Sequence, residues 1–117
     1  MRSKYHAKKV VIDGLTFDSK KEAQRYGELL LLQRAGHLNN LKVHPLFELL
    51  AKFHHPIAGN QRAMTYTADF SYVEAPPRGW GSVVEDVKTK ATKTEAYKLR
   101  RKLFLKRYPE IDHREVE

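Results

Sequence analysis

The pattern of apolar and polar positions predicts two helices set among short strands. Ser19-Lys20-Lys21-Glu22 has the form of a capping box, and the residues that follow predict a helix that continues to Ala35 and ends at Gly36. Thr92-Lys93-Thr94-Glu95 has the same form and predicts a second helix, which runs to about Arg107 before Pro109. The chain is therefore expected to have two helices, with strand-forming segments before the first helix, between the two helices and after the second.

Turn residues divide the rest of the chain. Asp13-Gly14 lies between two apolar triplets and predicts a short hairpin over residues 10–17. Residues 41–53 contain Pro45 and predict an edge or bent strand, followed by a turn at 54–60. Further strands are predicted at 64–73, 82–88 and 111–116, with a hairpin loop at 74–81. This order predicts a single α/β domain over residues 1–117, with a mixed central β-sheet flanked by helices and residues 1–9 as a basic N-terminal arm.

The charge balance indicates a polyanionic partner. The 117 residues include 22 Lys and Arg against 14 Asp and Glu, which gives a net charge of +8. Nucleic acid is favoured over a membrane, because no apolar run approaches the ~20 residues that span a bilayer. The N-terminus lacks the apolar stretch of a signal peptide, so a cytoplasmic location is expected. The absence of cysteine excludes disulfides and thiolate ligands, so any metal must bind oxygen or imidazole.

The segment Val83-Val84-Glu85-Asp86-Val87-Lys88 places charges where a buried strand normally has apolar side chains. Alternate residues of a strand share a face, so Asp86 and Lys88 are expected to project the same way, about 6.6 Å apart. Glu85 is expected on the opposite face. Charges in such a segment cost desolvation energy unless partners or a metal compensate, so this segment predicts a site.

Two further carboxylates fit the same site. Asp69 lies in the preceding strand-forming run, and antiparallel pairing of the two strands is expected to bring Asp69 and Asp86 onto one side. Glu22 shares a helical stripe with Tyr26 and Leu29, which indicates a position at the edge of the core. Neighbouring carboxylates repel each other unless a cation lies between them, and such oxygen ligands suit Mg²⁺ or Mn²⁺.

Together, Glu22, Asp69 and Asp86-Val87-Lys88 resemble the helix acid and the split D…(D/E)-x-K motif of the PD-(D/E)XK, or restriction-endonuclease-like, nucleases. The resemblance spans nearly the whole chain and is closest to small phage and prophage nucleases. In the order of its motifs the chain is also similar to archaeal Holliday junction resolvases. The residue before Asp69 is Ala68, where the family motif has proline.

The resemblance implies an Mg²⁺-dependent endodeoxyribonuclease that acts as a homodimer, often on branched DNA such as a four-way junction. If the gene is carried by a phage, the cytoplasm is that of the host cell. Carried onto this chain, Glu22, Asp69 and Asp86 become metal ligands and catalytic residues, with the Val87 carbonyl as a further ligand. Lys88 becomes the catalytic lysine, as a base or as an electrostatic stabiliser. Asp86 rather than Glu85 is assigned because Asp86 shares the face of Lys88.

Each of these features also has an ordinary structural explanation. Glu22 can simply complete the Ser19 capping box, and a single D-x-K segment occurs by chance in many basic proteins. His54 and His55 diverge to opposite faces of a strand, which favours a surface role over metal binding. Two other functions remain open: a non-catalytic nucleic-acid-binding protein, which would not need Mg²⁺, and a nuclease subunit of a transposition or restriction system.

Basic residues surround the predicted site in sequence and are expected to contact DNA phosphates without reading the base sequence. They are Lys4, Lys8, Lys9, Lys20, Lys90, Lys93, Lys98, Arg101 and Lys102. The run Leu29-Leu30-Leu31-Leu32 covers almost a full helical turn, which predicts burial from two sides. The second partner is either the protein's own core or the other subunit of a dimer.

Overall fold

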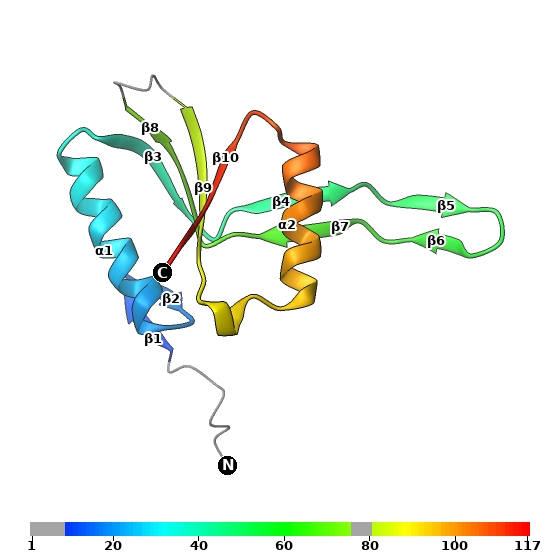
Figure 1. The fold of residues 1–117 in the computed structure, drawn as a ribbon, viewed down its shortest axis with the longest axis horizontal. Helices are drawn as coiled ribbons and strands as arrows, with labels where there is room; N and C mark the ends of the chain where they lie inside the picture. Colours follow the sequence, from blue (N-terminus) through cyan, green and yellow to red (C-terminus); the bar gives the residue numbers. More distant parts are fainter. Residues whose placement is uncertain (1–8, 76–80) are drawn as a thin grey trace, which may run out of the picture.

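The computed structural model describes residues 9–75 and 81–117 as a mixed α/β domain with one central sheet (Figure 1). Lys4, Lys8 and most of the predicted 74–81 loop lie outside the described residues. The helices are α1 (Lys20–Arg34) and α2 (Glu95–Arg107), with a short 3-10 turn, η1 (Lys90–Thr92). The strands are β1 (Val10–Ile12), β2 (Leu15–Phe17), β3 (Leu38–Val43), β4 (Leu46–Leu50), β5 (Phe53–His55), β6 (Gly59–Gln61), β7 (Met64–Thr67), β8 (Phe70–Glu74), β9 (Gly81–Val87) and β10 (Asp112–Val116).

Both helices are capped by hydroxyl side chains. Ser19 Oγ accepts a hydrogen bond from the Glu22 amide at 3.1 Å, and α1 ends before Gly36, whose φ of 84° only glycine adopts without strain. The predicted bounds of this helix are confirmed. The second helix begins later than predicted, because Thr94 rather than Thr92 accepts from the Tyr97 amide and Thr92 belongs to η1.

The central sheet has the strand order β10-β9-β8-β3. β9 pairs antiparallel with β8 and parallel with β10, so the sheet is mixed, as predicted. Successive residues of β9 enter different hydrophobic clusters. Val83 packs with Tyr26 and Leu29 of α1, whereas Val84 packs with Tyr97 and Phe104 of α2. The sheet therefore lies between the two helices, one on each face (Figure 1).

The region between the helices differs from the prediction. The predicted strand at 41–53 is divided among β3, β4 and β5, and the predicted strand at 64–73 is broken into β7 and β8 at Ala68 and Asp69. The predicted turn at 54–60 is instead the end of a β5–β6 hairpin, with turn residues only at 56–58. These breaks allow the chain to leave the sheet at 44–45 and return at 68–69.

The chain between these breaks forms a projecting two-stranded ribbon, which we call the arm (residues 46–67). β4 pairs with β7 and β5 pairs with β6, and neither pair joins the central sheet. Figure 1 shows the arm extending away from the body of the domain, beyond α2. Only its base is packed: Phe47 lies against Phe104 and Tyr108, and Tyr108 Oη donates to the Glu48 carbonyl at 2.8 Å.

The leucine run of α1 is not enclosed by its own domain. Leu29 is fully buried, but Leu31 is 65% exposed, so the prediction of burial from two sides within one domain is wrong. The helix packs on the sheet through one face only, with Glu22, Ala23, Tyr26 and Leu29. Among the described residues, no helix is long and apolar enough to cross a membrane.

Candidate functional site

The corner where the arm leaves the sheet brings two loop segments together. The His44 amide donates to the Asp69 carbonyl at 2.9 Å, and the Ala68 amide donates to the Pro45 carbonyl at 3.0 Å. His44 has a φ of 54°, in the left-handed region that few non-glycine residues adopt. Such a conformation costs on the order of 1 kcal/mol and persists where the surroundings enforce it, which is common at functional sites.

Glu22, His44 and Asp69 form an acidic and imidazole cluster at this corner. One potential ligand atom from each lies within 4.8 Å of the others. Glu22 is 4% exposed, and its Oε1 lies 2.7 Å from His44 Nε2. Glu22 thus contributes to the Ser19 cap through its backbone N–H, while its side chain faces His44. The capping explanation and the site explanation of Glu22 are therefore compatible.

Asp86 is held from several directions. The β8–β9 register pairs Phe70 with Glu85, so Asp69 stands opposite Asp86 one residue further on. The Asp69 amide donates to Asp86 Oδ1 at 3.1 Å. On its other oxygen, Asp86 accepts a hydrogen bond from Tyr66 Oη and lies 3.1 Å from His113 Nε2. Asp86 is 2% exposed, so these contacts replace the water it loses on burial.

Asp86 and Lys88 face the same cavity, as the strand alternation predicts. This cavity of about 480 Å³ is lined by Asp69, Asp86, Lys88, Tyr97, Arg100 and the end of β7. The Lys88 ammonium lies 4.6 Å from the centre of the Tyr97 ring. Glu85 faces the opposite way, fully buried, and its carboxylate binds the Arg25 guanidinium at 2.7 and 2.8 Å. Glu85 is therefore a structural ion-pair partner of α1 and not part of this cavity.

Asp69 is the residue that the two groups share. It belongs to the cluster with Glu22 and His44, and it also lines the cavity of Asp86 and Lys88. Its Oδ2 accepts from the Val87 amide at 2.7 Å. The pKa of Asp69 is raised to about 7, chiefly by burial; the nearby Glu22 and Asp86 carboxylates also raise it, whereas the hydrogen bond from the Val87 amide and the charge of Lys88 lower it.

This raised pKa predicts that stability falls as pH rises when no divalent cation is bound. Folded Asp69 holds its proton more tightly than the unfolded residue, whose pKa is 3.8, so its contribution to stability is fully present below pH 4 and is lost through pH 7. In chelator, the free energy of unfolding is expected to fall by about 2 kcal/mol between pH 5 and pH 8. Urea titrations at the two pH values measure it. Asp69→Asn is expected to remove most of the difference; an unchanged difference in that variant would contradict the assignment.

The structure separates the predicted DNA-contacting cations into two sets. Lys20, Lys90 and Lys102 are exposed, and no carboxylate among the described residues pairs with them. The others with described positions bind protein groups: Lys9 to Asp18, Lys93 to Glu115, Lys98 to Glu95, and Arg101 to both His113 and Glu115. Arg101 is half-buried and donates from Nε to His113 Nδ1 at 3.1 Å, which leaves His113 Nε2 to carry the hydrogen that faces Asp86. Arg101 therefore acts on the site through His113.

Sequence reasoning missed several residues of the site. His44 and His113 occur singly in strand-forming segments, where a histidine is usually an ordinary surface or core residue. For His44, the one available signal is its place immediately before Pro45, which marks the end of a strand. Tyr66 also contributes, through its hydrogen bond to Asp86. Asp86, predicted as a ligand, is not part of the compact cluster of Glu22, His44 and Asp69.

Comparison with known proteins gives a family but no activity. No curated protein and no solved structure matches the chain. One family model does, and it is described as a protein of unknown function, DUF1064. The match covers residues 2–116, so nearly the whole chain takes part in it. The chain therefore belongs to the DUF1064 family.

Proposed function

We propose that this protein is a divalent-metal-dependent endodeoxyribonuclease with a restriction-endonuclease-like fold. The observation that carries the proposal is the position of Asp69, which joins the Glu22 and His44 cluster to the cavity of Asp86 and Lys88. Carboxylates can hold a cation, and an ammonium group can stabilise charge on a phosphate; metal-assisted phosphodiester hydrolysis uses both functions. A branched substrate, a four-way junction above all, and a homodimer rest on the resemblance of the sequence motifs.

The donor set fits a divalent cation. Two carboxylates and one imidazole offer oxygen and nitrogen, a combination that accepts Mn²⁺ readily and Mg²⁺ through its oxygens and waters. Glu22, His44 and Asp69 are the proposed ligands. Asp86 adds negative charge beside them and fixes the Asp69 backbone. When bound, the cation supplies Lewis-acid activation of water and phosphate.

The chain's own groups perform the remaining tasks. Lys88 faces the cavity with Asp69 and Asp86, where an ammonium group stabilises the charge that develops on the phosphate during attack by water. Its contact with the Tyr97 ring limits the movement of the long side chain. Arg100, on the same wall, is placed to bind a phosphate of the DNA backbone. His113 and Tyr66 orient Asp86 from behind.

The proposal predicts cleavage that depends on metal. The purified protein is incubated with matched four-way junction, flap and linear duplexes, in Mg²⁺, in Mn²⁺ or in chelator, and the cuts are mapped. We expect nicks with either metal and none in chelator, with paired symmetrical nicks near the junction centre. DNA binding without a cut in either metal would contradict the nuclease proposal and support a non-catalytic binding protein. Equal cutting of all three substrates would contradict the preference for branched DNA.

A further inference from the structure

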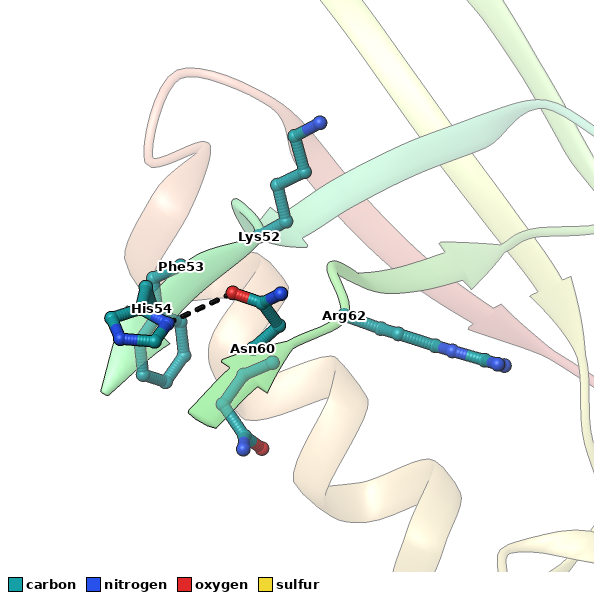
Figure 2. A pocket seen from close by; sticks show the side chains of 6 residues that line it. Lys52, Phe53, His54, Asn60 and Arg62 are labelled. Atoms are coloured by element: carbon teal, nitrogen blue, oxygen red, sulfur yellow. Dashed lines mark hydrogen bonds between the residues drawn. The ribbon is translucent and has the colours of Figure 1, made fainter. Parts of the chain in front are cut away.

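The arm carries positive charge that the domain does not neutralise. From Leu49 to Ala68 the sequence has no acidic residue, but it has Lys52, His54, His55 and Arg62. Lys52 and Arg62 are both exposed, and within the described part of the chain no carboxylate pairs with either of them. Figure 2 shows the two side chains extending away from the ribbon, whereas His54 and Asn60 bind each other across it at 2.9 Å.

The tip of the arm is apolar and open to solvent. Residues 56–58 form the turn, and Ile57 at its centre is 92% exposed, the highest exposure among the large hydrophobic residues described. Turns usually carry polar residues or glycine, and the fold gains nothing from an isoleucine in water. Below the tip, Phe53 is 46% exposed and borders a shallow cavity of about 530 Å³ with Lys52, His54, Asn60, Gln61 and Arg62 (Figure 2).

The arm is also placed next to the candidate site. Thr65, Tyr66 and Thr67 of β7 belong to its base and line the same cavity as Asp69 and Asp86. The segment from Leu46 to Ile57 contains β4, β5 and the start of the turn, and at about 3.3 Å per extended residue it spans at most roughly 35 Å from that cavity. A two-stranded ribbon is narrow enough to enter the major groove of DNA. DNA bound at the site is therefore within reach of the arm.

We infer that the arm recognises the branch point of the DNA substrate. Lys52 and Arg62 bind backbone phosphates on either side of the ribbon, and Ile57 inserts against bases that are unstacked at the branch. Apolar wedges of this kind insert between base steps and favour DNA that is already distorted. This inference rests on the proposed function, because it takes DNA as the ligand of the neighbouring site. It adds the element that selects the shape of the DNA.

Binding measurements in chelator test the arm separately from cleavage. Fluorescence anisotropy compares wild-type protein with Lys52→Ala/Arg62→Ala and with Ile57→Ser, on a four-way junction and on a linear duplex of equal length. The double variant is expected to bind both DNAs roughly tenfold more weakly at low salt, and the slope of log K against log salt is expected to fall by about 2. Ile57→Ser is expected to weaken junction binding roughly tenfold and to affect the duplex much less.

Two variants in α1 and β1, outside the arm, serve as matched controls. Lys21→Ala/Arg34→Ala removes two exposed cations from α1, and Val11→Ser removes a hydrophobic side chain that is 67% exposed. We expect these to keep the preference for the junction. Wild-type affinity and salt slope in the arm double variant would overturn the inference, since its cations would then serve only to protect the ribbon edges. If Ile57→Ser lowered the affinity for the junction and for the duplex equally, the proposed role of the tip in recognising the branch point would be overturned.

Three further outcomes separate this inference from its alternatives. Binding of anionic phospholipid vesicles that Ile57→Ser abolishes, with DNA affinity independent of the arm, would overturn the inference in favour of a membrane contact. Arm-dependent junction binding together with no cleavage in Mg²⁺ or Mn²⁺ would support the inference while contradicting the nuclease function. Metal-dependent cleavage, together with unchanged DNA binding by the arm variants, would support the nuclease function while overturning the inference.

Discussion

Asp69→Asn is expected to lower metal-dependent DNA cleavage at least about a thousandfold. Asp69 is the one described residue common to the Glu22 and His44 cluster and the cavity of Asp86 and Lys88. Asparagine has the same shape and still accepts a hydrogen bond from the Val87 amide, but it has no negative charge for a cation. Single-turnover cleavage of a four-way junction in Mg²⁺ measures the effect.

The same substitution is expected to stabilise the protein at pH 8 in chelator. The ionised Asp69 carboxylate is poorly solvated and lies near two other carboxylates, so removing its charge relieves an unfavourable state. A gain of about 2 kcal/mol in the free energy of unfolding is expected. A variant that is more stable but inactive indicates a residue kept for function at a cost in stability.

A matched control distinguishes this loss from a general effect of charge. Asp112→Asn removes another carboxylate, which is exposed and binds Arg114 at 2.9 Å outside the cavity. Its cleavage rate is expected to stay within about threefold of wild type, as for most surface substitutions. If Asp69→Asn cleaved within tenfold of wild type in Mg²⁺, the proposed metal site would be wrong.

Local patterns in the sequence were sufficient to predict the elements that form the walls of the site. Ser19 and the apolar spacing after it define α1, and the alternation of β9 correctly places Asp86 with Lys88 and apart from Glu85. Each of these features depends on residues within a few positions of one another. The pairing of β8 with β9 also follows from the sequence, because two strand-forming runs joined by a short connection usually pair.

The corner and the arm were not predictable in the same way. The break at Ala68 and Asp69 has no proline or glycine, and Asp69 leaves the strand because it bonds across the corner with His44. Residues 46–67 have the strand-forming pattern of a sheet, but they pair only with each other. Whether such a hairpin joins a sheet or projects from it is decided by distant packing, here of Phe47 on α2. His44 reaches the site through its backbone hydrogen bond to Asp69, and His113 reaches it through the pairing of β10 with β9, which are also contacts between distant parts of the sequence.

Arg25→Ala is expected to destabilise the protein by about 3–5 kcal/mol, the largest loss of stability that we predict. Glu85 is fully buried beneath α1 and binds Arg25 through both carboxylate oxygens, with a further hydrogen bond from Tyr72 Oη. Removing the guanidinium leaves a buried carboxylate without its counter-charge. Equilibrium urea unfolding at pH 7 measures the change.

Two comparisons show whether the loss comes from the unpaired Glu85 charge. Glu28→Ala removes the other carboxylate that contacts Arg25. Because the Glu28 side chain is 53% exposed, this substitution should lower the free energy of unfolding by no more than about 1 kcal/mol. The double variant Arg25→Met/Glu85→Leu should be more stable than Arg25→Ala, because it removes both charges together. A loss below about 1 kcal/mol in Arg25→Ala would contradict the role of the ion pair.

The double variant also tests which of two adjacent acids belongs to the site. Glu85 and Asp86 are neighbours in the sequence, but the pleat of β9 directs Glu85 to α1 and Asp86 to the cavity. Arg25→Met/Glu85→Leu should therefore retain metal-dependent cleavage at temperatures where it is folded, whereas Asp86→Asn should lose it. Loss of cleavage in the folded double variant would move the catalytic acid to Glu85 and require the opposite face of the sheet to contact DNA.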